Sequence, residues 1–146
     1  MYRHILIATD GSDLAEHAVT DGLSLAKFVG AKATVTIVVE PWFGSQPFMQ
    51  PWSLQELGNY NEQIKKQAAS VLSRAENAAK QAGLSCDTIQ VEGVRPYQAI
   101  IATATDRGCD LIVMASHGHS GLSAVVLGSV TNKVLTHTNI PVLVVR

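Results

Sequence analysis

Two glycine-containing segments near the C-terminus could bind an anion. Residues 110–134 read DLIVMASHGHSGLSAVVLGSVTNKV, in which strand-forming residues end in a loop with Gly118 and a second break follows at Gly128-Ser129. Glycine lets backbone N–H groups approach an anion without a Cβ in the way. A helix N-terminus adds unpaired donors and a positive dipole, and Ser129 and Thr131 add hydroxyl donors. The segment therefore predicts a binding site for the phosphates of a nucleotide.

Asp10 is a second candidate, far away in the sequence. Its carboxylate directly follows an apolar run and precedes Gly11 and Ser12. It could accept hydrogen bonds from a ribose hydroxyl, or hold a divalent cation such as Mg²⁺ together with phosphate. It could instead cap the following helix through backbone N–H groups. One carboxylate can do both, so the sequence leaves both roles open.

Enzymatic chemistry has weaker support. His117 and His119 flank Gly118 and titrate near neutral pH, but the sequence places no nucleophile or orienting acid beside them. It contains no G-x4-G-K-[ST] motif, whose lysine would neutralise phosphate charge, and no GxGxxG after the first apolar run. We therefore assign no catalytic residue and expect slow ATP hydrolysis at most.

The elements that must position these residues follow a regular order. Five apolar runs rich in valine and isoleucine are predicted strands: His4–Thr9, Ala33–Glu40, Cys86–Glu92, Asp110–Ala115 and Pro141–Val145. Several of these runs lack alternation, which is typical of strands buried on both faces of a parallel sheet.

Four helical patterns lie between the strands: Asp13–Phe28, Leu54–Ala82, Pro96–Arg107 and Leu122–Thr136, the last broken or kinked at Gly128. This alternation predicts an α/β fold of Rossmann-like type, with an open, twisted, parallel five-stranded sheet and helices on both faces. Ligands of such sheets bind beyond the carboxyl ends of the strands. Asp10, Glu40 and Gly118 follow three of those ends and should therefore lie at one edge of the sheet.

Length, composition and net charge limit the kinds of molecule that this protein is expected to bind. The 146 residues fit a single domain, and 47% hydrophobic content is enough for a core. A net charge of −1 gives no basic face for nucleic acid or a membrane surface. Cys86 and Cys109 lack metal-ligand spacing and are expected to be reduced thiols. No signal or membrane-spanning pattern is visible, so a cytoplasmic location is expected.

One long irregular segment, residues 41–53, reads PWFGSQPFMQPWS and carries four aromatic residues: Trp42, Phe43, Phe48 and Trp52. A long loop in a compact domain usually serves a function or moves. Its aromatic side chains could cover an adenine, pack on a partner, or form a lid packed on their own helix. The sequence does not separate these alternatives.

Three segments of the chain form a specific combination: IATDGSDLAEHAV near the start, DLIVMASHGHSGLSAVVLGSVTNKVL, and the closing PVLVVR. Through them the whole chain resembles the universal stress protein family. The nucleotide-binding branch of that family has the motif G-x2-G-x9-G-[ST], and here the nine-residue spacing from Gly118 to Gly128-Ser129 is intact. One position departs, because Ala115 stands where the motif has its first glycine. Its methyl group is expected to weaken or shift binding near the ribose or α-phosphate.

The resemblance implies an adenine-nucleotide site for ATP or AMP, with Mg²⁺ as a further candidate. Thr9 and Asp10 would lie near adenine and ribose, and Val38 or Val39 would offer backbone contacts to adenine. The remaining site residues would line the ribose and phosphates: Met114, Ala115, His117, Gly118, Gly128, Ser129, Val130 and Thr131. The resemblance also supports a homodimer that pairs its last strands, through Val142, Leu143, Val144 and Val145.

Three functions remain open at this stage. The first is a homodimeric, adenine-nucleotide-binding sensor or regulator of the stress response, acting on an unidentified protein partner. The second is a dimeric interaction module of the same fold that binds no nucleotide, for which Ala115 is the best support. The third is a slow ATPase or phosphotransferase, which would need Asp10 or His117 for turnover. A phospho-receiver domain fits poorly, because Glu92 is badly placed for its acidic residue and no lysine follows the last strand.

Overall fold

The computed structural model describes residues 1–42, 52–119 and 126–146, and its centre is a parallel sheet. The strands are β1 (His4–Thr9), β2 (Lys32–Val39), β3 (Cys86–Glu92), β4 (Leu111–Ala115) and β5 (Val142–Val145), in the order β3-β2-β1-β4-β5. These bounds agree with the predicted runs to within one residue, and the predicted fold class is confirmed. From β1 the chain builds outward first through β2 and then through β4, so the strand order reverses beside β1. That reversal creates the crevice where ligands of open sheets bind.

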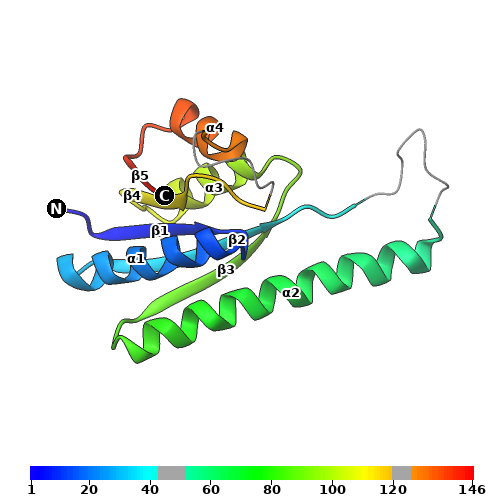
Figure 1. Cartoon of the computed structure of the whole chain (residues 1–146), viewed down its shortest axis with the longest axis horizontal. Coiled ribbons are helices and arrows are strands. Elements are labelled where there is room, and N and C mark those ends of the chain that lie inside the picture. Colours follow the sequence, from blue (N-terminus) through cyan, green and yellow to red (C-terminus); the bar gives the residue numbers. More distant parts are fainter. Residues whose placement is uncertain (43–51, 120–125) are drawn as a thin grey trace.

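The helices cover both faces of the sheet (Figure 1). On one face, α1 (Asp13–Val29) and α2 (Leu54–Gln81) pack on Ile5, Ile7 and Val35. On the other face, α3 (Pro96–Asp106) and α4 (Ser129–His137) cover a second cluster that includes Leu6, Ala8, Ile112 and Met114. Successive strand residues point to opposite faces, so β1 contributes to both clusters and is almost fully buried. This burial explains its continuous apolar sequence.

Local signals set the helix ends. Ser12 is the N-cap of α1, and its side chain accepts a hydrogen bond from the Ala15 N–H (3.3 Å). Ser53 and Glu56 form a reciprocal capping box at the start of α2. That helix continues through Gly58 to Gln81 without interruption. The predicted bounds of α1, α2 and α3 are therefore confirmed within one residue.

The last predicted helix was broken where expected, at Gly128, but its prediction for residues 126–128 was wrong. Residues 122–125 of the predicted helix lie outside the described residues, and 126–128 are not helical. Helix α4 begins at Ser129, with Gly128 as an extended N-cap (φ −59°, ψ 152°). The Gly128 N–H donates to the carbonyl of Ser116 (2.7 Å), which ties this residue to the end of β4. An apolar run alone could not reveal that tertiary bond.

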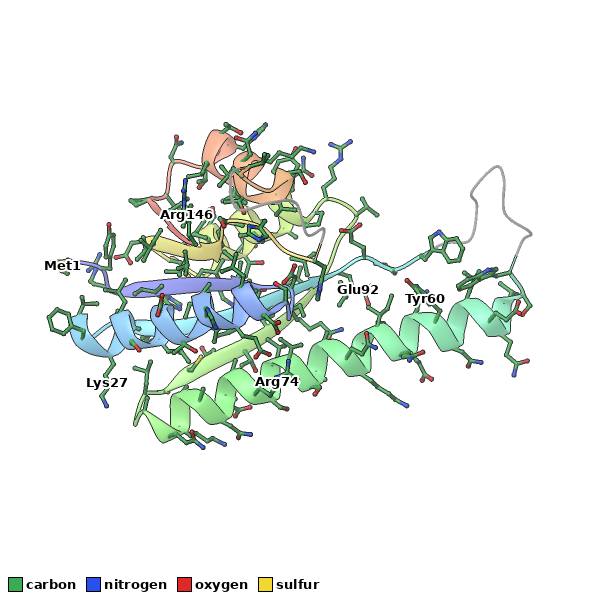
Figure 2. The ribbon with its side chains drawn as sticks, in the orientation of Figure 1. Met1, Lys27, Tyr60, Arg74, Glu92 and Arg146 are labelled. Carbon is green, nitrogen blue, oxygen red and sulfur yellow. The ribbon has the colours of Figure 1, made fainter. Side chains whose placement is uncertain are left out.

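The N-terminal end of α2 extends beyond the sheet (Figure 1) and carries an aromatic cluster. Trp42 packs edge-on against Trp52, with ring centres 4.1 Å apart, and Tyr60 of α2 lies 5.3 Å from Trp52. Figure 2 shows Tyr60 on this extended part of the helix. The two tryptophans thus pack on their own helix, one of the predicted alternatives. Phe43 and Phe48 lie outside the described residues.

Strand β5 forms one edge of the sheet and pairs with β4. Leu143, on this strand, is 41% exposed, while Val142, Val144 and Val145 are half-buried. The other edge is β3. Among the described helices, none combines the length and the apolarity that crossing a membrane requires.

Candidate functional site

A cavity of about 310 Å³ opens at the carboxyl ends of the strands, at the reversal of strand order. It brings together every predicted site residue except Val39: Thr9, Asp10, Val38, Met114, Ala115, His117, Gly118, Gly128, Ser129, Val130 and Thr131. The lining also includes residues that sequence reasoning missed: Ala8, Ala15, Thr36, Glu40, Pro96, Ile100 and His119. Segments 100 residues apart in the chain therefore build one site.

Val39 does not line this cavity. It is buried in the core beneath α1 and α2, and it borders a separate hollow on that side of Asp10. Its carbonyl accepts a hydrogen bond from the Gly93 N–H (3.0 Å). Because side chains alternate along a strand, Val38 faces the cavity and Val39 faces away. The side chain of Val38 therefore lines the cavity and that of Val39 does not, while the backbone contact to adenine that the resemblance implies for Val38 or Val39 stays a prediction.

Asp10 is held by the backbone on both sides. Its Oδ1 accepts the Ser12 N–H (2.9 Å), and its Oδ2 accepts the His119 N–H (3.1 Å). The Nε2 of His119 also lies 2.8 Å from the Asp10 carbonyl oxygen. Since Ser12 is the cap of α1, the carboxylate of Asp10 is not the helix cap. It instead joins β1 to the loop after β4 and remains exposed at the mouth of the cavity.

Gly118 is required by the position of Asp10. A Cβ atom on Gly118 would overlap the Oδ2 atom of Asp10. Any larger residue would push the carboxylate away from the loop. This close approach, and not a left-handed backbone, explains the need for glycine here.

The N-terminus of α4 presents to the cavity backbone donors that have no hydrogen-bond partner among residues 1–42, 52–119 and 126–146. The N–H groups of Ser129, Val130 and Thr131 are the first three of the helix and have no partner within it. Gly128 also lacks room for a side chain, because a Cβ there would lie 3.0 Å from the Cα of His117. The hydroxyl of Thr131 is buried and donates to the Ala115 carbonyl (2.7 Å). It anchors α4 to β4 and is not the free donor that the sequence suggested.

Ala115 packs toward helix α1. Its side chain belongs to a buried cluster with Ala15 and Ala18, beside Leu14 and Val145. The methyl group that departs from the glycine motif is therefore engaged with protein, although Ala115 also borders the cavity and is 7% exposed.

Two cationic side chains, those of Arg95 and Lys133, lie beyond the end of the cavity at helix α4. A hollow of about 470 Å³ shares Glu40, Pro96, Ser129 and Val130 with the cavity and is also lined by Val94, Arg95, Tyr97 and Lys133. The Nζ of Lys133 lies 5.5 Å from the ring centre of Tyr97. Arg95 precedes the N-terminus of α3, and Lys133 lies one turn into α4. Sequence reasoning missed both residues, although the Arg95-Pro96 pair marks a helix start.

The described residues offer few groups for covalent or metal chemistry. His117 Nδ1 lies 3.1 Å from the hydroxyl of its neighbour Ser116, and no carboxylate in residues 1–42, 52–119 and 126–146 bonds to its ring. Desolvation raises the pKa of Cys86 and of Cys109 to about 11, so neither thiol is a ready nucleophile. Within the same ranges, no three His, Cys, Asp or Glu side chains gather as a metal site.

Comparison with known proteins agrees with this geometry. The sequence pattern of the universal stress protein family matches residues 1–146. A universal stress protein of Methanocaldococcus jannaschii is 33% identical over all of this chain and 83% of its own length. The UspA structure from Lactobacillus plantarum superposes with a TM-score of 0.85 at 25% identity, covering 99% of this chain and 98% of its own.

A further solved structure is of a universal stress protein in complex with cAMP. It has a TM-score of 0.72 and 26% identity, and the match covers 99% of this chain and 97% of that one. The family pattern over the full chain and the agreement of these folds lead to one conclusion. This chain belongs to the universal stress protein family.

Proposed function

We propose that this protein is a cytoplasmic, homodimeric regulator of the stress response that binds an adenine nucleotide, with slow hydrolysis at most. The observation that carries the proposal is the two-ended cavity at the strand reversal. Its apolar end is formed by Ala8, Val38, Ile100 and Met114, and its other end holds the free N–H groups of α4. A nucleotide has the same division, with a flat base at one end and phosphate at the other.

The two ends fit a nucleotide by their chemistry. Buried aliphatic side chains suit the faces of an adenine, and an uncapped helix N-terminus suits phosphate oxygens. Between them, Asp10 is exposed at the cavity mouth and still has acceptor capacity for ribose hydroxyls, since each carboxylate oxygen has two lone pairs. A universal stress protein with the same fold has been solved in complex with cAMP, which supports adenine as the base in this proposal.

A magnesium ion fits the site only with help from the ligand. Asp10 and Glu40 both line the cavity, but two carboxylates do not complete an octahedral shell. Mg²⁺ usually takes one or two carboxylates together with phosphate oxygens and waters. We therefore expect Mg²⁺ to matter for a nucleotide with a phosphate chain and not for AMP.

We further propose that β5 pairs with β5 of a second copy. This strand is a sheet edge with unpaired backbone groups on one side, and its Leu143 is largely exposed. An exposed apolar edge is normally covered or paired. Sedimentation or light scattering would test this directly, and Leu143→Lys should convert a dimer into a monomer.

Calorimetric titration with ATP, AMP and cAMP, each with and without Mg²⁺, tests the nucleotide proposal. We expect micromolar binding for at least one of them. Gly128→Asp places a carboxylate where phosphate should lie and should weaken binding by about 100-fold or more, because like charges repel strongly in a desolvated site. Gly58→Asp controls for the added charge alone, since a Cβ at Gly58 meets nothing within 4 Å. Gly128→Ala controls for the crowding that any Cβ at position 128 meets at His117, and it should lose less affinity than Gly128→Asp.

The outcomes separate the two leading functions. Binding that is lost in Gly128→Asp and kept in Gly58→Asp would support a nucleotide-dependent regulator. Absence of heat with every nucleotide would favour a dimeric interaction module of the same fold.

A further inference from the structure

Thr36 has an unusual environment at the floor of the cavity. It lies in the middle of β2, between Ala8 of β1 and Ile89 of β3, and is 1% exposed. It is also one of the residues that line the cavity. Among the described residues, its Oγ1 is the one buried side-chain oxygen or nitrogen without a hydrogen-bond partner.

Three other buried threonines, two in the sheet and one in α4, have the hydrogen bonds that Thr36 lacks. Thr34, two residues earlier on the same face of β2, bonds to the Nε2 of His4 (2.8 Å). The hydroxyl of Thr9 accepts the Gly11 N–H (3.1 Å), and that of Thr131 donates to the Ala115 carbonyl (2.7 Å). Each of these hydroxyls has a clear structural role, and Thr36 does not share it.

An unpaired hydroxyl in a core is costly, because burial removes its hydrogen bonds to water. A valine would fill nearly the same volume without that cost. The neighbours of Thr36 along the cavity, among them Val38, Ile100 and Met114, are apolar and offer no side-chain partner. The described residues therefore leave the hydrogen bond of this hydroxyl to a ligand or a water in the cavity.

The strand order indicates which part of a ligand would meet this hydroxyl. Phosphate is expected at α4, next to β4, and the ribose at Asp10, at the end of β1. Strand β2 lies on the far side of β1 from β4. Thr36 therefore belongs to the end of the cavity that would hold the base.

We infer that the Thr36 hydroxyl forms a hydrogen bond with the edge of the bound nucleobase and is a specificity-determining residue of this site. A hydroxyl can donate one hydrogen bond and accept two, so it can pair with either a ring nitrogen or an exocyclic group. This inference rests on the proposed function, since that function supplies the ligand. It adds a direct polar contact with the base, beside the aliphatic side chains of Val38 and Ile100 and near the carboxylate of Glu40, which also lines the cavity.

The test compares Thr36→Val with wild-type protein by calorimetry, using AMP, IMP, GMP and ribose 5-phosphate. The valine variant should bind the preferred nucleotide about 5- to 10-fold more weakly and discriminate less between bases, which is the usual worth of one neutral hydrogen bond. Ribose 5-phosphate has no base, so its affinity should be unchanged. Thr36→Ser restores the hydroxyl and should keep the wild-type preference.

A second readout separates recognition from structure. Without ligand, Thr36→Val should melt at the same temperature as wild type or higher, because it removes an unpaired buried hydroxyl. Thr34→Val is the matched control, and it should lower the melting temperature because it breaks the bond to His4.

Several results would overturn the inference. Unchanged nucleotide affinity in Thr36→Val would do so, as would an equal loss for ribose 5-phosphate, or a lower melting temperature of the free variant. If wild-type protein binds no nucleotide at all, the proposed function fails as well. If the wild-type protein binds a nucleotide and Thr36→Val binds it with the same affinity, the proposed function stands and only the contact of Thr36 with the base is rejected.

Discussion

The two ends of the cavity are built in different ways. The end proposed for phosphate is made of backbone groups at the start of α4, and glycine at positions 118 and 128 lets Asp10 and His117 approach the chain closely there. The base-facing end is made of side chains from buried strands, including Thr36 and Val38. Backbone donors depend on where a chain may approach closely, whereas side-chain walls depend on residue type. Substitutions should therefore damage the first end by preventing close approach of the chain. They should damage the second end by changing which side-chain groups meet the ligand.

Gly118→Ala should damage the first end through geometry alone. The new Cβ would overlap Asp10 Oδ2, so the carboxylate would have to leave the His119 N–H and its proposed place beside the ribose. Hydrogen bonds to charged groups are worth about 1.5–3 kcal/mol, so losing the contact between Asp10 and the ribose should lower affinity for AMP about 10- to 100-fold. Calorimetry measures the loss, and thermal unfolding shows whether the fold survives.

Gly58→Ala is the control for that variant, because space around Gly58 is open and α2 is already helical there. It should leave affinity unchanged and stabilise the fold by about 0.5–1 kcal/mol. Wild-type affinity in Gly118→Ala would mean that Asp10 does not contact the ligand. It would also mean that the phosphate-facing end does not depend on close approach of the chain.

Lys133→Gln tests how far the phosphate-facing end extends, by comparing the affinities for ATP and AMP. Lys133 lies in the hollow beyond Ser129, where a longer phosphate chain would extend. ATP should therefore lose about 3- to 10-fold in affinity and AMP less than about 2-fold, since partly exposed charge pairs contribute about 1 kcal/mol. The loss should shrink as salt is added.

Lys27→Gln controls for the change in net charge, because Lys27 lies in the last turn of α1. An equal loss for ATP and AMP in Lys133→Gln would place the lysine near the first phosphate and not beyond it.

The same contrast explains what the sequence could predict. Gly118 and Gly128-Ser129 are visible in the sequence because a backbone site requires glycine at fixed spacing. The strands were visible as well, since burial on both faces leaves continuous apolar runs such as Ile5–Ala8. Thr36 was not, because threonine is common in strands and its missing partner appears only after folding.

Tertiary bonds account for the remaining differences. The start of α4 depends on the bond from Gly128 to Ser116, and the choice of Val38 over Val39 depends on which face of β2 meets the cavity. Neither feature has a local sequence signal. Local rules therefore predicted the elements and the backbone end of the site, while the side-chain end required the strand order.

Ala115→Gly should have the smallest effect on binding, although it restores the glycine of the family motif. The methyl group of Ala115 packs against Ala15 and Ala18, so its removal opens space mainly toward α1, although Ala115 also borders the cavity. Affinity for AMP and ATP should change by less than about 2-fold, while the free energy of unfolding should fall by about 1–2 kcal/mol from the lost contact and the added chain freedom. Urea unfolding and calorimetry on the same preparation measure both quantities. A gain of tenfold or more in ATP affinity would instead show that the methyl group meets the ligand, and that side-chain size limits the phosphate-facing end as well.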